Sequence, residues 1–144
     1  MKAEAYALFC LAGRSYHSQI LKDKMLKKGY AKLEVDEIIG KLKNMGYLND
    51  EEWLLRFVEN KTAQGYGLRM IAYLLLQKKI AMPPTFEEEA SSILDFVLRK
   101  GLDKKMLKDK LIAYLLRRGF SYEAIKETLL ELKTRHDRDS AETQ

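Results

Sequence analysis

Apolar residues recur along this chain with a period of about 3.6 residues, and the strict alternation of a strand is almost absent. One segment shows the helical pattern most clearly, because its apolar residues fall on a single face: Leu33, Val35, Ile38, Ile39, Leu42 and Met45. The pattern predicts an all-α chain of about eight helices. One helix begins at Asn49 or Asp50, and the others are expected near 2–14, 17–28, 33–45, 68–79, 86–100, 103–118 and 121–134.

Helix boundaries are marked by residues with restricted or unusual backbone preferences. Gly29 follows a helical segment and is a good left-handed cap. Pro83 and Pro84 forbid helix immediately before them. Thr85 and Glu88 have the spacing of a capping box, which predicts that the next helix starts directly afterwards.

A five-residue pattern that ends a helix occurs more than once. Leu26–Tyr30 matches Leu116–Phe120, and a degenerate copy occupies Leu76–Ile80. The copies lie about 40–50 residues apart, a spacing typical of stacked helical repeats. We therefore expect tandem three-helix repeats that form an elongated, curved array. The predicted divisions are a first repeat at 1–48, a shortened second repeat at 49–84, a third repeat at 85–135 and a flexible tail at 136–144.

Charge and composition favour an anionic partner and argue against several protein classes. The 144 residues include 26 Lys or Arg and 21 Asp or Glu, which gives a net charge of +5. Cys10 is the single cysteine, so an internal disulfide and a four-cysteine zinc site are excluded, and a buried, inert thiol is expected. No apolar run reaches the roughly 18 residues of a membrane span. The start, Met1–Glu4, lacks the features of a signal peptide, so a cytoplasmic location is expected.

Catalytic motifs are hard to find. His17 and His136 are the only histidines, and neither has a serine, cysteine or carboxylate at motif spacing. The sequence contains no phosphate-binding glycine loop and no metal-ligand cluster. Glu87–Glu89 is better explained as acidic residues at a helix start than as a metal site. We therefore expect no enzyme activity, no metal and no cofactor.

Basic residues near helix ends are the best candidates for binding. Taken singly, each is most simply a solvated side chain, but basic pairs recur at equivalent repeat positions and predict a stripe that meets phosphates or an acidic protein surface. If one helix covers 103–118, Lys104, Lys105 and Lys108 fall within an arc of about 100°. The candidate residues are Lys22, Lys24, Lys27, Lys28, Arg69, Arg99, Lys100, Lys104, Lys105, Lys108, Arg117 and Arg118.

The predicted helix near 68–79 is apolar almost all round. It contains the run Met70–Leu76, so it is either sandwiched between neighbours or presents an adhesive face. The sandwiched arrangement is favoured. If the side that carries Tyr73 or Leu76 is exposed, it is the candidate for apolar contacts with a protein partner.

Several ordered motifs together resemble the RecX family. The stretch Met45–Trp53, continuing through Arg56–Val58 and Gly65–Gly67 to Ile71, is similar to the family signature, and Leu115–Ile125 is similar to its last repeat. The chain departs from the family pattern at three places and in the shorter segment that follows Ile80. At these places it has Lys79 where glycine is usual, Gln64 where a basic residue is common, and Leu68 where proline is frequent.

The resemblance implies a cytoplasmic bacterial protein without a cofactor, built from tandem three-helix repeats. Members of the family bind RecA filaments on DNA, lie in the filament groove and restrain ATP turnover, strand exchange and coprotease activity. The implied roles are in DNA recombination, DNA repair and the SOS response. The expected partners are a RecA filament and, non-specifically, single- or double-stranded DNA, and the expected state is a monomer away from membranes.

Other functions fit the same helices. A basic helical module could bind DNA without a RecA partner. A helix-turn-helix module that reads DNA sequence would need a recognition helix with Arg, Asn or Gln aimed at base edges. The basic helices here carry mostly Lys instead. A generic helical adaptor would keep the fold, and its binding would be insensitive to ionic strength.

Overall fold

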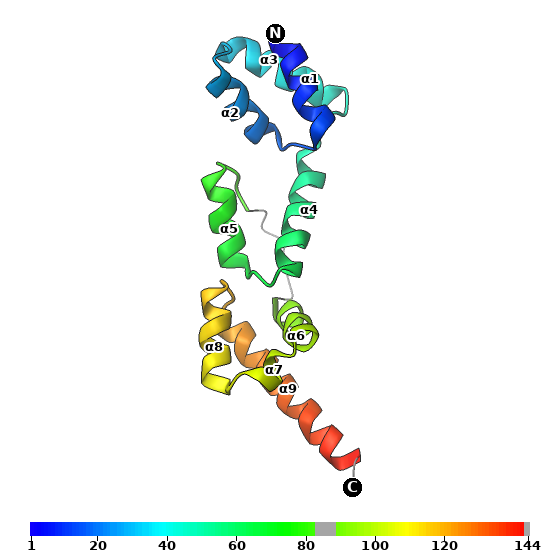
Figure 1. The fold of residues 1–144 in the computed structure, drawn as a ribbon, viewed down its shortest axis with the longest axis vertical. Helices are drawn as coiled ribbons and strands as arrows, with labels where there is room; N and C mark the ends of the chain where they lie inside the picture. The colour runs from blue at the N-terminus through cyan, green and yellow to red at the C-terminus, as the bar shows by residue number, and fades with distance from the viewer. Residues whose placement is uncertain (83–88, 143–144) are drawn as a thin grey trace. The chain divides into compact units, whose positions relative to one another are not determined.

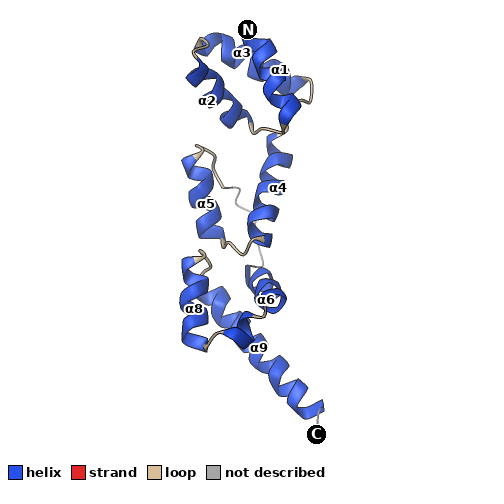
Figure 2. Ribbon diagram, in the orientation of Figure 1, coloured by secondary structure: helices blue, strands red, loops and turns tan. Residues whose placement is uncertain are grey.

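The computed structural model describes residues 1–82 and 89–142, and every regular element within these ranges is an α-helix (Figure 2). The prediction of an all-α chain is therefore confirmed. The predicted capping box of Thr85 and Glu88, and the predicted start of a helix at 86, lie outside the described residues. The helices are α1 (Ala3–Gly13), α2 (Ser18–Lys28), α3 (Lys32–Asn44), α4 (Asp50–Ala63), α5 (Leu68–Gln77), α6 (Glu89–Lys100), α7 (Leu102–Lys105), α8 (Lys108–Arg117) and α9 (Tyr122–Glu142).

The chain divides into two compact units, each with its own contacts. The first unit comprises residues 1–58 and 78–80. In it α1, α2 and α3 pack against one another, as Figure 1 shows. Its core is formed by apolar side chains from all three helices and the segments that follow them: Ala3, Ala7, Cys10, Tyr16, Leu21, Met25, Val35, Ile38, Ile39, Leu42 and Leu48. Cys10 is buried, as expected for a structural thiol.

The second unit comprises residues 59–77 and 81–144. Here α9 packs against both α6 and α8, as α3 packs against α1 and α2 in the first unit (Figure 1). The three-helix arrangement thus occurs twice, whereas α4 and α5 have no third helix in the described residues 78–82 that follow. The core of this unit consists of Ile93, Phe96, Val97, Leu102, Leu111, Leu115, Phe120, Ala124, Ile125 and Leu132.

The recurring pattern at helix ends is a recurring backbone geometry. Gly29 has φ +108° and Gly119 has φ +93°, so both are left-handed caps. In each case the following aromatic residue donates its N–H back to the helix, Tyr30 to Met25 at 3.3 Å and Phe120 to Leu115 at 3.2 Å. The degenerate copy shares the left-handed backbone, because Lys79 has φ +61° although it is not a glycine.

Two turns of the second unit approach each other so closely that side chains are excluded between them. The N–H of Gly67 donates to the Arg118 carbonyl at 2.7 Å, and the N–H of Arg69 donates to the Gly119 carbonyl at 3.2 Å. A Cβ on Gly67 would lie 2.3 Å from the Gly119 carbonyl carbon. The turn before α5 and the turn after α8 are therefore joined backbone to backbone.

Two predicted boundaries are wrong. The single helix expected at 103–118 is two helices, because the backbone is extended at Met106 (φ −124°, ψ 142°) and Leu107. This break lets the half-buried Met106 pack against the core of the second unit. The last helix extends to Glu142, well beyond the predicted end near 134. The residues beyond 134 include no Gly or Pro within the helix. An ion pair at 3.4 Å between Glu131 and Arg135 bridges the predicted end of the helix and supports its continuation.

Candidate functional site

Most of the basic residues of α2 are engaged within the first unit. Lys22 Nζ lies 3.0 Å from an Asp36 carboxylate oxygen. Lys24 donates to the Tyr16 hydroxyl at 3.0 Å, and Lys28 lies 5.7 Å from the centre of the Tyr6 ring. Lys27 is exposed and forms no ion pair with a described residue. The positive charge of α2 is thus partly compensated by its own surroundings.

The contact between Lys24 and Tyr16 changes the acidity of both groups. The hydrogen bond from Lys24 lowers the pKa of Tyr16, against the opposing effect of burial, because it stabilises the phenolate. The same hydrogen bond raises the pKa of Lys24. This lysine is therefore held charged beside an aromatic ring.

Arg99 and Arg118 bind the protein's own backbone. Arg99 donates to the Ala63 carbonyl at 2.7 Å. Arg118 donates through Nε to the Gly65 carbonyl at 3.0 Å and through a second nitrogen to the Gln64 carbonyl. Its guanidinium also lies 4.3 Å from the centre of the Tyr66 ring. Arg118 thus reinforces the junction between the two turns.

The remaining basic candidates of the second unit face solvent. Their side chains form no ion pair with a described residue, and they comprise Arg69, Lys100, Lys104, Lys105, Lys108 and Arg117. The predicted arc of Lys104, Lys105 and Lys108 on one helix is wrong, since the break at Met106 places the first two on α7 and the third on α8. Asp103 is directed inward, with 8% of its side chain exposed and His136 at 3.5 Å. Asp109 is exposed and directly follows Lys108 on α8. The exposed lysines therefore form a positive surface that the neighbouring acids offset only in part.

Helix α5 differs from the favoured expectation. Ile71 and Leu75 are fully buried, but Tyr73 is 56% and Leu76 is 72% exposed. The helix is therefore packed on one side only, and the prediction that it is sandwiched between neighbours is wrong for the other side. That exposed apolar side is the one that the sequence indicated as a candidate protein contact.

A Ser–His–Asp set meets in the first unit, which sequence spacing did not indicate. Ser18 donates its N–H and its hydroxyl to the two Asp50 carboxylate oxygens, at 2.7 Å and 2.5 Å. His17 caps α2, where its Nδ1 accepts the N–H of Gln19 at 3.0 Å, and its Nε2 lies 3.7 Å from Asp50. Ser18 is buried, and it is hydrogen-bonded to Asp50 rather than to His17. This is the geometry of helix capping rather than of an activated nucleophile.

The acidities of this capping set follow from its contacts. Burial lowers the pKa of His17, and Lys43 adds to the effect, while Asp50 opposes it. Partial burial raises the pKa of Asp50. The two Ser18 hydrogen bonds, with His17 and Lys43 nearby, outweigh that burial and leave the pKa below its usual value. Both lowered pKa values therefore favour a neutral His17 imidazole and a charged Asp50 carboxylate near neutral pH.

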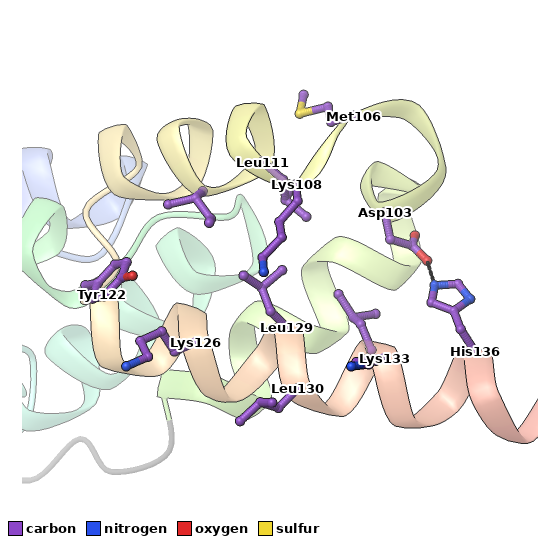
Figure 3. Close-up of a pocket in the computed structure, with 12 residues that line it drawn as sticks. Asp103, Met106, Lys108, Leu111, Tyr122, Lys126, Leu129, Leu130, Lys133 and His136 are labelled. Atoms are coloured by element: carbon purple, nitrogen blue, oxygen red, sulfur yellow. Dashed lines mark ion pairs between the residues drawn. The ribbon is translucent and has the colours of Figure 1, made fainter.

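A cleft between α8 and α9 includes the predicted basic residue Lys108 in its lining. It has a volume of about 570 Å³, and Figure 3 shows Tyr122 and His136 at opposite ends. Sequence analysis missed this site, although Tyr122, Lys126, Leu129, Lys133 and His136 follow one another at alternating intervals of four and three residues. That spacing on α9 was the available signal.

Residues 1–82 and 89–142 contain neither a metal centre nor a membrane-spanning helix. These ranges contain no group of three or more His, Cys, Asp or Glu side chains that could hold a metal ion. They also contain no helix long and apolar enough to cross a membrane.

Sequence comparison relates the chain to a family of regulatory proteins. Residues 96–129 match the model of the RecX third three-helix domain. The regulatory protein RecX of Caldanaerobacter subterraneus subsp. tengcongensis is 30% identical over 137 residues, which cover 89% of this chain and 69% of the relative. That of Chlorobium limicola is 29% identical over 142 residues, which cover 91% of this chain and 89% of the relative.

Structural comparison agrees with the sequence. The crystal structure of RecX from Lactobacillus salivarius matches with a TM-score of 0.69 and 19% identity, over 92% of this chain and 95% of that one. At this identity the match supports the fold, and the sequence relatives supply the family. The chain belongs to the RecX family.

Proposed function

We propose that this protein binds a RecA–DNA filament and lowers its ATPase, strand-exchange and coprotease activities, without catalysis of its own. Membership of a family whose curated relatives are named regulatory proteins supports a regulatory role. The fold adds to this, because its described helices expose basic and apolar side chains that a partner can contact. A protein of this kind acts by occupying a surface of its partner.

The observation that carries the proposal is the exposed lysine surface on α6, α7 and α8. Lys100, Lys104, Lys105 and Lys108 are exposed, and none forms an ion pair with a described residue. Charges of this kind attract phosphates over a long range and position a protein without reading sequence. That property suits a regulator that acts wherever a filament forms on DNA.

The other basic candidates contribute unequally in this proposal. Arg69, Arg117 and Lys27 are exposed and can reach a partner. Lys22, Lys24 and Lys28 would first have to exchange internal contacts for external ones. Arg99 and Arg118 act indirectly, since their guanidinium groups hold backbone carbonyls.

A titration of RecA ATPase activity on single-stranded DNA tests the proposal. We expect the protein to slow ATP turnover at or below equimolar amounts, and replacement of Lys104, Lys105 and Lys108 by Ala to weaken that effect. Three fewer phosphate contacts would also reduce the log–log salt slope by roughly two. A triple variant of Lys2, Lys32 and Lys78 is the matched control, because these exposed lysines lie outside the proposed set.

Direct binding to DNA separates the main alternative from this proposal. A basic module that works without RecA would bind labelled single-stranded DNA as tightly alone as in the presence of the filament, and would leave ATP turnover unchanged. We expect tighter association with the filament. Unchanged RecA turnover at a clear molar excess of the protein would refute the proposed function.

A further inference from the structure

The cleft between α8 and α9, called the α8–α9 cleft below, shares only Lys108 with the lysine surface of the proposed function. It is lined by apolar side chains of both helices and by charged groups at its edges. In Figure 3, Lys108 extends from α8 toward α9, and Leu129 points from α9 into the space between the helices. The cleft thus combines an apolar interior with positive edges.

The floor of the cleft is made of core and near-core side chains. Leu111 and Leu132 are buried, with 3% and 4% exposure, and Met106, Ile112 and Leu129 are partly buried around them. These side chains offer no hydrogen-bonding group to a ligand. A ligand that gains from contact with this floor must bring apolar groups of its own.

The edges of the cleft carry one sign of charge. Lys108, Lys126 and Lys133 are exposed and form no ion pair with a described residue. The single lining carboxylate, Asp103, is turned inward against His136. The surface that a ligand would meet is therefore positive at its edges and apolar at its centre.

We propose that the α8–α9 cleft binds an acidic amphipathic helix of a protein partner. The apolar face of such a helix would cover Leu129 and Ile112, and its flanking carboxylates would meet Lys126 and Lys133. Nucleic acid fits less well, because a phosphate backbone gains nothing from a floor of leucine and isoleucine. Charge complementarity at the edges together with the apolar floor selects this ligand class.

The size of the cleft agrees with a short helical segment. The ten residues of α8 span about 15 Å, which corresponds to about three turns of a partner helix. A volume of about 570 Å³ lies within the range of roughly 300–1,000 Å³ that is usual for ligand sites. Two or three apolar anchors would fit, with the exposed Tyr122 and Leu130 at the margin.

Fluorescence anisotropy with a synthetic peptide tests the inference on the full chain. The probe is a labelled peptide of about twelve residues, roughly three turns, with Leu on one face and Glu on either side. Three comparison probes keep its length: one with Lys in place of Glu, one with Ala in place of Leu, and an oligothymidylate. We expect micromolar binding of the first peptide and markedly weaker binding of all three comparison probes.

Charge reversal at the cleft provides the matched variants. Lys126→Glu with Lys133→Glu should weaken binding of the acidic peptide about tenfold, since two attractions become two repulsions. Both side chains are exposed, so the fold should tolerate the change. Lys110→Glu with Arg138→Glu makes the same change in net charge on the same unit, at exposed residues outside both the cleft and the lysine surface, and should leave binding within about twofold.

Four results would overturn the inference. Equal binding of the Leu-free peptide would show a purely electrostatic surface, and tight oligothymidylate binding that the cleft variant abolishes would show a nucleic-acid site. Self-association in sedimentation velocity that the cleft variant abolishes would identify a second copy as the occupant. Wild-type binding by the cleft variant would place the peptide elsewhere. The test is separate from the filament proposal, because neither Lys126 nor Lys133 belongs to that lysine surface.

Discussion

Replacement of Gly119 by Ala should destabilise the protein far more than replacement of Gly29, although both glycines cap helices at equivalent repeat positions. Their backbone angles are similar, with φ +93° and +108°. Their surroundings differ. A Cβ on Gly29 would meet nothing within 4 Å, whereas a Cβ on Gly119 would lie 2.5 Å from the Met70 nitrogen and 2.6 Å from the Met70 Cβ. The pair therefore separates backbone strain from steric exclusion.

The expected losses follow from these contacts. A left-handed conformation costs an alanine about 1–2 kcal/mol, partly offset by its smaller unfolded-state entropy, so Gly29→Ala should cost about 1 kcal/mol. In Gly119→Ala the start of α5 must also move. That movement breaks the hydrogen bonds that Gly67 and Arg69 make to the other turn, each worth about 1 kcal/mol. The total expected loss is about 3 kcal/mol.

Urea unfolding followed by circular dichroism measures both losses, and hydrogen exchange assigns them to a region. Amides of residues 67–71 and 118–120 should exchange faster in Gly119→Ala and remain unchanged in Gly29→Ala. Equal destabilisation of the two variants would refute the close approach of the turns, since strain alone would then account for both.

Three further substitutions test other contacts. Lys79→Gly should stabilise the protein by about 0.5 kcal/mol in urea unfolding, because release of left-handed strain exceeds the added chain entropy. The contact at 3.8 Å between Asp23 and the exposed Lys79 side chain contributes little. A loss of stability would contradict this expectation. Arg118→Lys should lower the stability by roughly 1–2 kcal/mol in the same measurement, because a lysine cannot donate to both the Gly65 and Gln64 carbonyls as the guanidinium does. An unchanged unfolding midpoint would argue against these two hydrogen bonds. His17 has a lowered pKa, so the unfolded chain binds more protons just below pH 6.5, and stability should fall as pH drops through that region. His17→Asn keeps a capping acceptor that does not titrate, so it should flatten the fall in stability between about pH 7.5 and 5.5. An unaltered pH profile would assign the pH dependence to other groups. Below about pH 4, protonation of Asp50, whose pKa is also lowered, should add a further loss of stability in both the wild type and the variant.

Local physical chemistry explains which features the sequence predicted well. Helix formation depends on neighbours three and four residues apart, and capping on a few residues at each end, so the periodicity placed most helices to within a few residues. The recurrence of the Leu26–Tyr30 pattern also reflects a local geometry. Lys79 shows how strongly this helix-end geometry is preferred, because the backbone there is left-handed even though the residue is not glycine.

The break between α7 and α8 could not be predicted for the opposite reason. No glycine, proline or capping residue occurs at Met106 or Leu107. The extended backbone there exists because Met106 packs into the core of the second unit. That interaction joins residues that only the tertiary structure brings together, so helical periodicity alone extended the helix across it.

The sequence by itself determined the helices, their caps, the three-helix repeats and the excess of positive charge, because each depends on composition or on residues close in the chain. The tertiary structure decided which charges face solvent. Arg118 appeared equivalent to Arg117, yet it binds carbonyls more than fifty residues away in the chain. The sequence did not indicate Lys126 and Lys133 as binding residues, yet they border the α8–α9 cleft. The free energy of a charge depends on its surroundings, and those surroundings are assembled only when distant segments pack together.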